Sequence, residues 1–468
     1  MKQIIYSLSL VIMLISFSGC EKYTDITPKG QNLLNKASDI DLLLNAQYSG
    51  NAFNNMKQST LINDMYGQVV NVPVTIAGPI NMNKVLLTYD EKSDRAALTV
   101  ADDNYDGMYE IISKVANITI VNSETASGDK ALLNLYKAEA YIIRAYMHYM
   151  LVNNYAKAYD PATAETDGGI PYVNSINFEE LNRKNTIKEV YDNINADIAS
   201  AFALNTLPDK PKNIMRVGKG FAYAVKAMVL MSMRNYAGAL EAANLSLTYN
   251  STLEDHRPIL SLPLASRIVT RNGVTSPDNI FYAYQSKPWP ALFGVSIEIL
   301  TKFYETGNIF KDYTPVYNFP SGILYNGVDG SAIWSNLAYE QNAAGITTSD
   351  MIMVKAEALI RTGKVADGMA EIEKIRVRRI NPTVYAPLMA NTEAEGMAYL
   401  QKVSRIEFLF TWKNFINVKR WNREGKYPVV VERTVNNIKY TLSPNSPLWV
   451  FPFPQSATMF NTTLTQNY

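Results

Sequence analysis

The strongest constraint on this fold is a set of long segments in which apolar residues recur with the period of an α-helix. In the segment Asp129–Ala156 the apolar positions are 132, 135, 136, 140, 143, 146, 147, 150 and 151. A second such pattern runs over Asn185–Pro208, after a break at Gly168, Gly169 and Pro171. Side chains three and four residues apart share one helix face, so both segments are predicted to be amphipathic helices.

Two further segments repeat one another. Residues 218–250 read as two helices joined at "RNY", and residues 351–379 form a related unit. Small residues, Ala227 and Ala239 in the first unit and Gly363 and Gly368 in the second, stand where paired helices must approach closely. Both units resemble the tetratricopeptide helical hairpin, and together with the long helices they favour a helical-repeat scaffold. The predicted fold class is therefore mainly α.

The predicted repeats are interrupted by irregular chain. About a hundred residues before position 350 are rich in Gly, Pro, Asn and aromatic residues, and an insertion of this size usually carries function. We expect one domain over residues 20–468, divided into a helical scaffold, a loop-rich excursion that faces the ligand, and a loop-rich tail. Their expected ranges are about 30–50, 105–250 and 345–425 for the scaffold, about 251–345 for the excursion, and 425–468 for the tail.

Residues 1–19 have the layout of a secretory signal peptide. Lys2 precedes an apolar stretch, and Ser18 and Gly19 stand directly before Cys20, the single cysteine of the sequence. Small residues before a cysteine resemble the bacterial lipoprotein signal, which implies that Cys20 is lipidated and becomes the first residue of the mature chain. An incidental cysteine in an ordinary signal peptide is the alternative. Acyl chains on Cys20 would hold an otherwise soluble body to a membrane.

Composition excludes several classes of function. With 44 basic and 43 acidic residues and no basic cluster, the chain has no electrostatic footprint for nucleic acid. It has 30 Tyr but only 2 His, which favours contact surface over proton chemistry. We expect His148 to be a satisfied helix residue, and we assign no catalytic residues, no cofactor and no metal. Asp102, Asn104 and Asp106 match part of a calcium loop, but Ser113 replaces its final Glu, and an acidic helix cap is the favoured interpretation.

Several motifs, in order along most of the chain, resemble the SusD/RagB family of outer-membrane nutrient-binding lipoproteins. They are "DITPKGQ", "GGIPYV", "NTIKEVYDNINADIASA", "MRVGKGFAYAVKAMVLMSMRNYAGALEAAN", "RIEFLFTWKNFINVKRW", "FPFPQS" and "NTTLTQNY". In the fifth motif, Arg405, Glu407, Phe410, Phe415, Arg420 and Trp421 match the family spacing, whereas Thr411, Trp412, Asn414 and Asn417 depart from it. We expect the charged residues of this motif to form buried pairs that fix a helix.

The resemblance implies a lipid-anchored protein of the outer membrane, facing the cell exterior, that has a tetratricopeptide-type scaffold. It further implies capture of oligosaccharides or related nutrients and their delivery to a TonB-dependent, SusC-like transporter, without catalysis. Two alternatives stay open: a helical-repeat scaffold that binds only protein, and a glycan-degrading enzyme.

Sugar binding requires aromatic rings for the C–H face of a pyranose and polar partners for its hydroxyls. Exposed aromatic residues beside Asn, Asp or Gln on loops are therefore the candidates. Trp289 and Trp334 are favoured because they lie in the excursion and not on a periodic helix face. The other candidate ligand-binding residues are Tyr325, Asn326, Tyr105, Tyr109 and Tyr66.

Overall fold

The computed structural model covers most of the chain. It describes residues 34–45, 58–59, 62, 65–68, 72–177, 179–267, 273–283, 293–296, 298–313, 331–334, 342–409 and 411–468. For residues 65–68, 72–74, 293–296, 300 and 331–334 only the backbone is described. Within these ranges, no helix combines the length and hydropathy that crossing a lipid bilayer requires.

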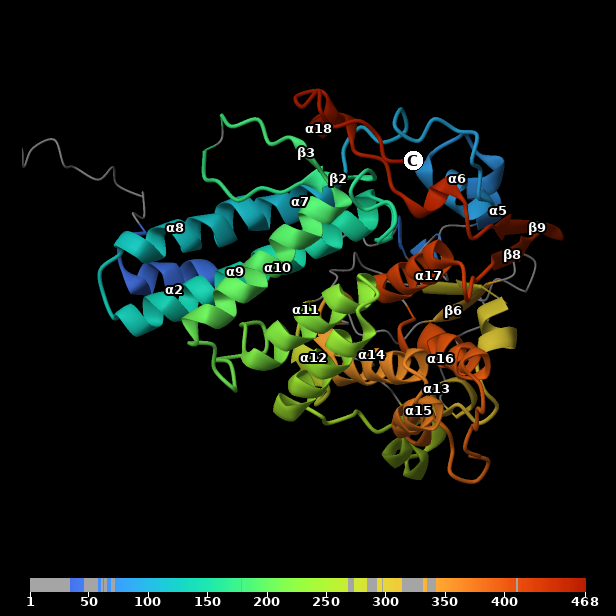
Figure 1. The fold of residues 1–468 in the computed structure, drawn as a ribbon. Coiled ribbons are helices and arrows are strands. Elements are labelled where there is room, and N and C mark those ends of the chain that lie inside the picture. Colours follow the sequence, from blue (N-terminus) through green and yellow to red (C-terminus); the bar gives the residue numbers. More distant parts are fainter. Residues whose placement is uncertain are drawn as a thin grey trace, which may run out of the picture.

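The described chain is mainly helical, with four small antiparallel sheets (Figure 1). The α-helices are α2 (Ala37–Asn45), α5 (Val72–Ala77), α6 (Met82–Thr88), α7 (Asp103–Ile111), α8 (Ile118–Thr125), α9 (Lys130–Tyr155), α10 (Ile187–Leu204), α11 (Lys219–Ser232), α12 (Tyr236–Tyr249), α13 (Ile309–Asp312), α14 (Thr348–Arg361), α15 (Val365–Arg379), α16 (Glu393–Glu407), α17 (Trp412–Glu424) and α18 (Gln455–Thr458). The strands are β1 (Met65–Gln68), β2 (Gly168–Pro171), β3 (Lys184–Thr186), β4 (Asn279–Phe281), β5 (Phe293–Ser296), β6 (Ser331–Trp334), β7 (Ile346–Thr347), β8 (Val431–Val435) and β9 (Ile438–Leu442). A short π-helix, Ile112–Asn117, joins α7 to α8, and another, Ile299–Phe303, precedes α13.

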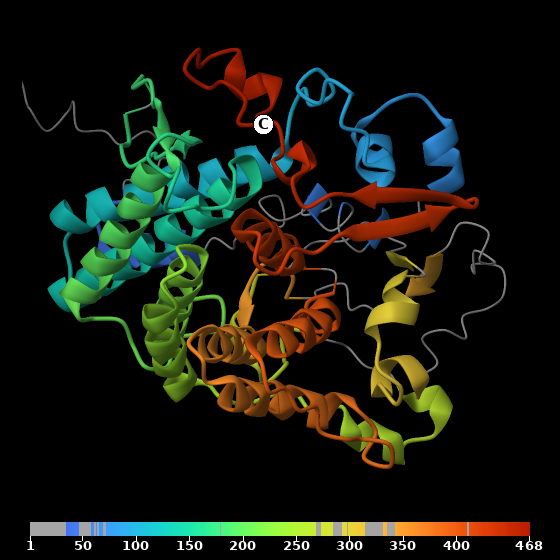
Figure 2. The same cartoon turned by 45° about the vertical axis from the view of Figure 1, so that its right-hand side comes forward.

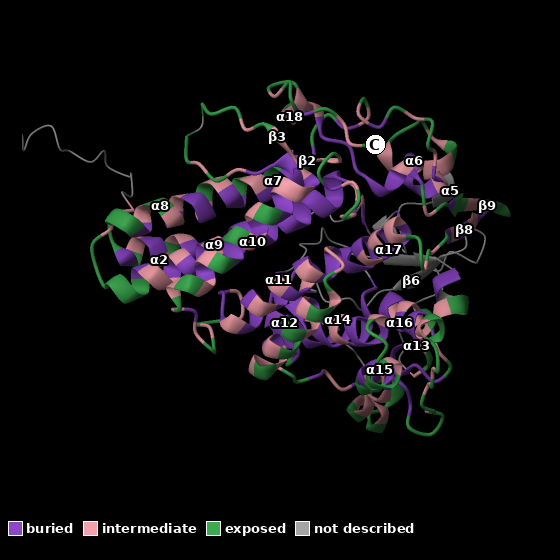
Figure 3. Ribbon diagram, viewed as in Figure 1, coloured by how far each residue is buried: buried purple, intermediate pink, exposed green. Residues whose placement is uncertain are grey.

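Helices that follow one another pack as hairpins, and the hairpins stack. Helix α9 packs on α10, α11 on α12, and α14 on α15, while α12 packs against α14 and so joins neighbouring hairpins. Figure 1 shows this stack running from α8 and α9 on one side to α15 and α16 on the other. Buried residues follow the contact faces, and exposed residues lie on the outer faces (Figure 3). The prediction of a mainly α, helical-repeat scaffold is confirmed.

The predicted helices are found with clear boundaries. Helix α9 starts after Asp129, whose side chain accepts a hydrogen bond from the Ala131 backbone N–H. Helix α10 starts at a capping box of Thr186 and Glu189 and ends at Asn205, which has a left-handed backbone. Its end lies before Pro208, as the sequence pattern requires. These caps satisfy backbone donors at the helix ends, which explains why the helices start where they do.

Small residues allow the close helix contacts. Ala227 and Ala239 are fully buried. At Gly368, a Cβ would lie 2.6 Å from a side-chain carbon of Ile360 and 2.8 Å from the carbonyl oxygen of Ala356. Any larger residue at position 368 would therefore push α15 away from α14. Ala227, Ala239 and Gly368 are thus closely packed, whereas the expectation for Gly363 is wrong: a Cβ there would meet no atom within 4 Å, and its positive φ of 83° serves the turn between α14 and α15.

The tail packs against the carboxyl end of α9. The Asn467 side-chain amide donates hydrogen bonds to the carbonyls of Tyr155 and Gly169, and the Phe451 N–H donates to the carbonyl of Asn154. A Cβ on Gly168 would lie 2.3 Å from the Asn467 side-chain oxygen, so position 168 needs glycine. The "GGIPYV" and "TQNY" motifs are therefore two halves of one contact.

The excursion between α12 and α14 leaves the helical scaffold and returns to it at neighbouring positions. Strand β4, at its beginning, pairs with β7, at its end, with Phe281 opposite Ile346. The Asn342 side chain joins the two sides: its amide donates to the Phe281 carbonyl, and its oxygen accepts from the Ala283 N–H. The scaffold thus stays continuous across a long insertion. Figure 2 shows the returning β7–α14 segment beside α11 and α12.

Asp278, at the start of β4, is fully buried beside this junction. The Ser276 hydroxyl donates a hydrogen bond to one carboxyl oxygen at 2.8 Å, and the other oxygen has no hydrogen-bond partner within the described residues. Burial, together with the negative charge of Glu254, raises the pKa of Asp278 to about 6. Because the folded pKa lies above that of the unfolded chain, the protonated carboxyl stabilises the fold at low pH and this stability is lost as pH rises through about 6.

We therefore expect Asp278→Asn to flatten the dependence of the unfolding free energy on pH between about 4 and 6.5. The variant should be more stable than the wild type at pH 7.5, by about 2 kcal/mol, because no buried charge has to form. Urea unfolding over this pH range tests the expectation. A variant whose pH profile runs parallel to that of the wild type would contradict it.

Candidate functional site

Three strands that are far apart in the sequence form one small sheet in the order β1–β5–β6. Strand β5 is central and antiparallel to both neighbours: Met65 of β1 lies opposite Val295, and Trp334 of β6 lies opposite Phe293. Two of these strands belong to the excursion, and the third comes from the irregular region before α5. The sheet therefore joins two segments of the excursion to the segment that contains Tyr66.

This sheet carries two of the predicted ligand-binding residues. Tyr66 lies on β1 and Trp334 on β6, separated by one strand. Strand β5 begins four residues after Trp289 in the sequence. Trp289 itself, Tyr325, Asn326 and the predicted lipidation site Cys20 lie outside the described residues. The strand pairing thus brings together segments that no local sequence pattern could place side by side.

Tyr105 and Tyr109 lie elsewhere, on α7. The Tyr105 side chain is 6% exposed, and its ring packs edge-on against Tyr155, with 5.1 Å between the ring centres. The prediction of an exposed ring at Tyr105 is therefore wrong, because core packing leaves the ring no free face for a sugar. Tyr109 is half-buried, and its hydroxyl donates a hydrogen bond to the carbonyl of Pro171.

The acidic residues before Tyr105 form a helix cap. Asp102 accepts a hydrogen bond from the Asn104 N–H at 2.9 Å and another from the Tyr155 hydroxyl at 2.7 Å. Both carboxyl oxygens are therefore engaged, and the cap favoured by the sequence is confirmed. Among the described residues, no cluster of three or more His, Cys, Asp or Glu side chains has the arrangement of a metal site.

His148 is a structural residue of α9. Its imidazole is fully buried and stacks on the Tyr172 ring, with 3.8 Å between the ring centres. One ring nitrogen contacts the Arg144 carbonyl at 2.9 Å, and the other accepts a hydrogen bond from the Val173 N–H at 3.0 Å. Burial lowers the pKa of His148 to about 3, so the ring is neutral at physiological pH. The prediction of a satisfied helix histidine is confirmed.

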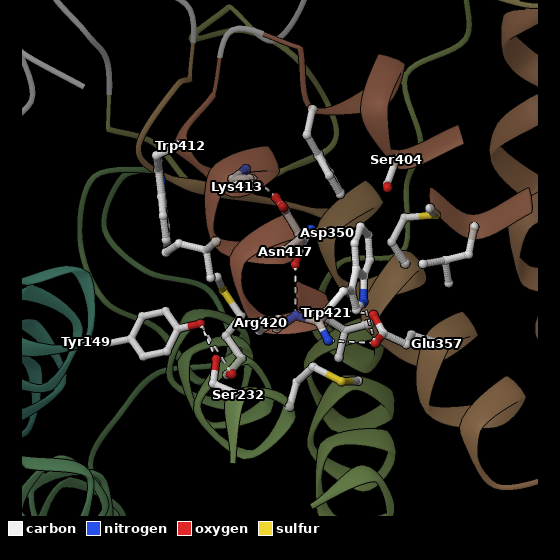
Figure 4. Close-up of a pocket in the computed structure, with 17 residues that line it drawn as sticks. Tyr149, Ser232, Asp350, Glu357, Ser404, Trp412, Lys413, Asn417, Arg420 and Trp421 are labelled. Carbon is white, nitrogen blue, oxygen red and sulfur yellow. Dashed lines mark hydrogen bonds and ion pairs between the residues drawn. The ribbon is translucent and has the colours of Figure 1, made fainter. Parts of the chain in front are cut away.

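The charged motif in α16 and α17 forms buried ion pairs, as expected. The Arg420 guanidinium binds both carboxyl oxygens of Glu357 on α14, and the Trp421 indole N–H donates to the same carboxylate at 2.9 Å (Figure 4). Glu407 pairs with Arg379 of α15 at 2.8 Å. Each charge is held inside the protein by its partner, which is the condition for burying it.

Two residues of this network were missed by the sequence analysis. Lys413 of α17 is buried and pairs with Asp350 of α14 at 2.5 Å. Asp350 also completes a capping box with Thr347 at the start of α14, and this threonine–acid spacing was the signal available in the sequence. Two residues that depart from the family pattern take local roles: Thr411 caps α17, and Asn417 accepts a hydrogen bond from Arg420.

These residues enclose a cavity that is too small for a sugar. Its volume is about 40 Å³, and Tyr149, Ser232, Asp350, Glu357 and Arg420 contribute polar walls (Figure 4). Ligand pockets are roughly ten times larger, whereas a cavity of this size holds water. The buried network therefore supports the fold and is not the ligand site.

Comparison with known proteins gives consistent matches over most of the chain. A SusD-like family model described as "Starch-binding associating with outer membrane" matches residues 22–231, and the model of the SusD family matches residues 317–468. SusD-like protein P2 of Formosa agariphila is 23% identical over 252 residues, which make up 51% of this chain and 45% of that protein. This chain therefore matches less than half of the length of that relative.

Solved structures share the fold. A SusD superfamily protein from Bacteroides thetaiotaomicron superposes with a TM-score of 0.72 at 16% identity, covering 92% of this chain and 100% of the other. A putative sugar binding protein from Bacteroides vulgatus superposes with a TM-score of 0.66 at 16% identity, covering 93% of this chain and 99% of the other. A SusD-like carbohydrate binding protein from the same species superposes with a TM-score of 0.66 at 13% identity, covering 92% of this chain and 97% of the other.

The buried network predicts a large effect of removing one partner. Glu357→Gln would leave the Arg420 charge uncompensated inside the protein, so we expect a loss of about 3–5 kcal/mol in unfolding free energy, measured by urea unfolding. The control is Asp192→Asn, which breaks the exposed i,i+4 pair with Lys188 and should cost about 0.5 kcal/mol or less. Equal losses in the two variants would contradict the structural role of the pair.

Proposed function

The chain belongs to the SusD/RagB family, and from this premise we propose that it captures glycans at the outer surface of the outer membrane and delivers them to a TonB-dependent, SusC-like transporter. The family is described as starch-binding and associated with the outer membrane. His148 is buried and both of its ring nitrogens are engaged with the backbone, so it is not a candidate for a catalytic base.

The observation that carries the proposal is the β1–β5–β6 sheet. It brings the strand of Tyr66 and the strand of Trp334 to either side of β5. We propose that Tyr66, Trp289 and Trp334 present rings to the C–H faces of sugar residues, and that Tyr325 and Asn326 supply polar contacts. Tyr109 stays a secondary candidate, because the residue is only partly buried.

The proposal predicts binding that depends on the aromatic residues. We expect Trp334→Ala and Trp289→Ala each to weaken binding of a glycan found in a broad oligosaccharide panel by about thirtyfold, since losing an aromatic anchor costs about 2 kcal/mol. Isothermal titration calorimetry measures the affinities. Trp334→Phe keeps a flat ring and should retain part of the affinity.

The matched control is Phe460→Ala, which removes an aromatic side chain that is 80% exposed on the tail, far from β6 in the sequence. It should bind as the wild type does. A panel in which no glycan binds would reject the sugar ligand. Release of shorter saccharides from a bound glycan, followed by chromatography, would instead establish the enzyme alternative.

The proposed anchor has its own test. We expect the full-length protein, expressed in a Bacteroidetes host that is fed a labelled fatty acid, to carry the label and to fractionate with the outer membrane. Cys20→Ala should lose the label, because the thiol to which the lipid attaches is absent, and should leave the membrane fraction. An unlabelled wild-type protein would contradict the lipid anchor.

A further inference from the structure

A second cavity, of about 400 Å³, lies where the carboxyl end of α9, the last turns of α17 and the tail meet. None of its lining residues belongs to β1, β5 or β6. It is lined by Lys157, Ala158, Lys419, Arg423, Pro444, Asn445, Ser446, Pro447, Trp449, Val450, Asn467 and Tyr468. Its volume is within the range of small-ligand pockets and suits one or two sugar residues.

Lys419 is the unusual group in this cavity. Its side chain is buried, and Nζ donates hydrogen bonds to the carbonyls of Asn153 and Ala156, both at 2.6 Å. An ammonium group has three donors, so these two bonds leave one. No carboxylate among the described residues forms an ion pair with Lys419, and burial holds its pKa well below the usual range. An anion beside Nζ would offset the cost of burying the ammonium charge.

Two further cations face the same cavity. Lys157 and Arg423 both pair with Asp167, at 2.9 and 2.8 Å, and their side chains are 43% and 31% exposed. The Arg423 Nε is buried and makes no hydrogen bond within the described residues, and the Asp160 carboxylate lies 3.7 Å away. Neither aspartate lines the cavity, so its lining side chains include three bases and no acid.

Other residues of the lining are apolar. Pro444, Pro447 and Val450 contribute aliphatic surface, and Trp449 and Tyr468 contribute rings. The Trp449 indole N–H donates to the Ser443 carbonyl at 2.9 Å, which fixes the orientation of its ring. Tyr468 is 41% exposed, and its ring beside the proline side chains suits the C–H face of a pyranose, whereas Trp449 is 4% exposed and packs into the core. The basic side chains suit a negative substituent on the same molecule.

We propose that this cavity binds an acidic saccharide unit, with its anionic group near Lys419, Lys157 and Arg423 and its sugar ring against Tyr468 and the prolines. The shared chemistry is a carboxylate or sulfate on a sugar. A role of Lys419 as a cap for the end of α9 accounts for the two carbonyl bonds. It does not account for the open cavity beside Lys419, which Lys157 and Arg423 also line although Asp167 pairs with both from outside the lining. This site is separate from the aromatic sheet and goes beyond the proposed function.

The test compares charged and neutral ligands on the full mature chain. Digalacturonate, a 6-sulfated galactose disaccharide and neutral galactobiose serve as probes in calorimetry at low and moderate salt. We expect one of the charged probes, but not galactobiose, to bind, and its affinity to fall as salt rises. The first two probes distinguish a uronate from a sulfated sugar.

The decisive variants are Asn445→Glu and Asn445→Gln. Asn445 is exposed and lines the cavity, and these two replacements have the same shape but differ in charge. Asn445→Glu should lower the affinity for the charged probe about tenfold or more, whereas Asn445→Gln should change this affinity little. Arg423→Gln should also weaken it, and circular dichroism shows whether that variant is folded.

Equal binding of galactobiose and the charged probes, equal affinity of the two Asn445 variants, or binding of inorganic sulfate as tight as that of the charged saccharides would overturn the inference. Trp334→Ala should leave binding of the charged probe unchanged. A protein that binds neutral glycans through Trp334 but neither charged probe would overturn this inference and leave the proposed function standing.

Discussion

The buried Arg420–Glu357 pair is the interaction on which the rest of the structure depends. It joins α17, near the carboxyl end of the chain, to α14, the first scaffold helix after the excursion. The Trp421 indole adds a third contact to the same carboxylate, and Lys413–Asp350 adds a second pair between the same two helices. Charged groups inside a protein tolerate only a narrow range of partner positions, so these pairs fix α17 on α14 more specifically than apolar packing would. Since Lys419 of α17 also binds the carboxyl end of α9, one helix contacts scaffold helices from before and after the excursion.

This arrangement separates the buried ion pairs from the strands that carry the proposed ligand-binding residues. The excursion begins and ends at β4 and β7, where backbone pairing and the Asn342 side chain close it. The sheet β1–β5–β6 is also built from backbone hydrogen bonds, which do not depend on side-chain identity. Residues such as Tyr66 and Trp334 are therefore placed by a frame that would tolerate other side chains at the same positions. Binding residues on loops held by a rigid scaffold commonly vary in this way.

The parts of the fold that sequence predicts are those in which local pattern decides. Helices α9 and α10 follow from apolar spacing and from caps such as Asp129 and Thr186, all within a few residues of one another. The helix cap at Asp102 was predicted but the burial of Tyr105 was not, because the sequence does not show that the Tyr105 ring packs against Tyr155 of α9. The pairing of β1 with β5 depends on contacts between distant segments, for which three strands of four residues carry little signal. The partners of the buried charges were equally out of reach, because spacing shows that Lys413 lies on a helix but not that Asp350 lies opposite.

The cavity at Lys419 exists because the tail folds back against the carboxyl end of α9. The motif "SPNSPLW" reads as a proline-rich loop, and its residues wall the cavity only because Asn467 and the Phe451 backbone fix the tail against α9. That docking brings the apolar loop opposite the last turns of α17, where Lys419 and Arg423 are one helical turn apart. A lysine that only capped α9 would be satisfied equally well by a closed, packed wall. The open volume of about 400 Å³ beside Lys419, which Lys157 and Arg423 also line, is the feature that a helix cap alone does not require.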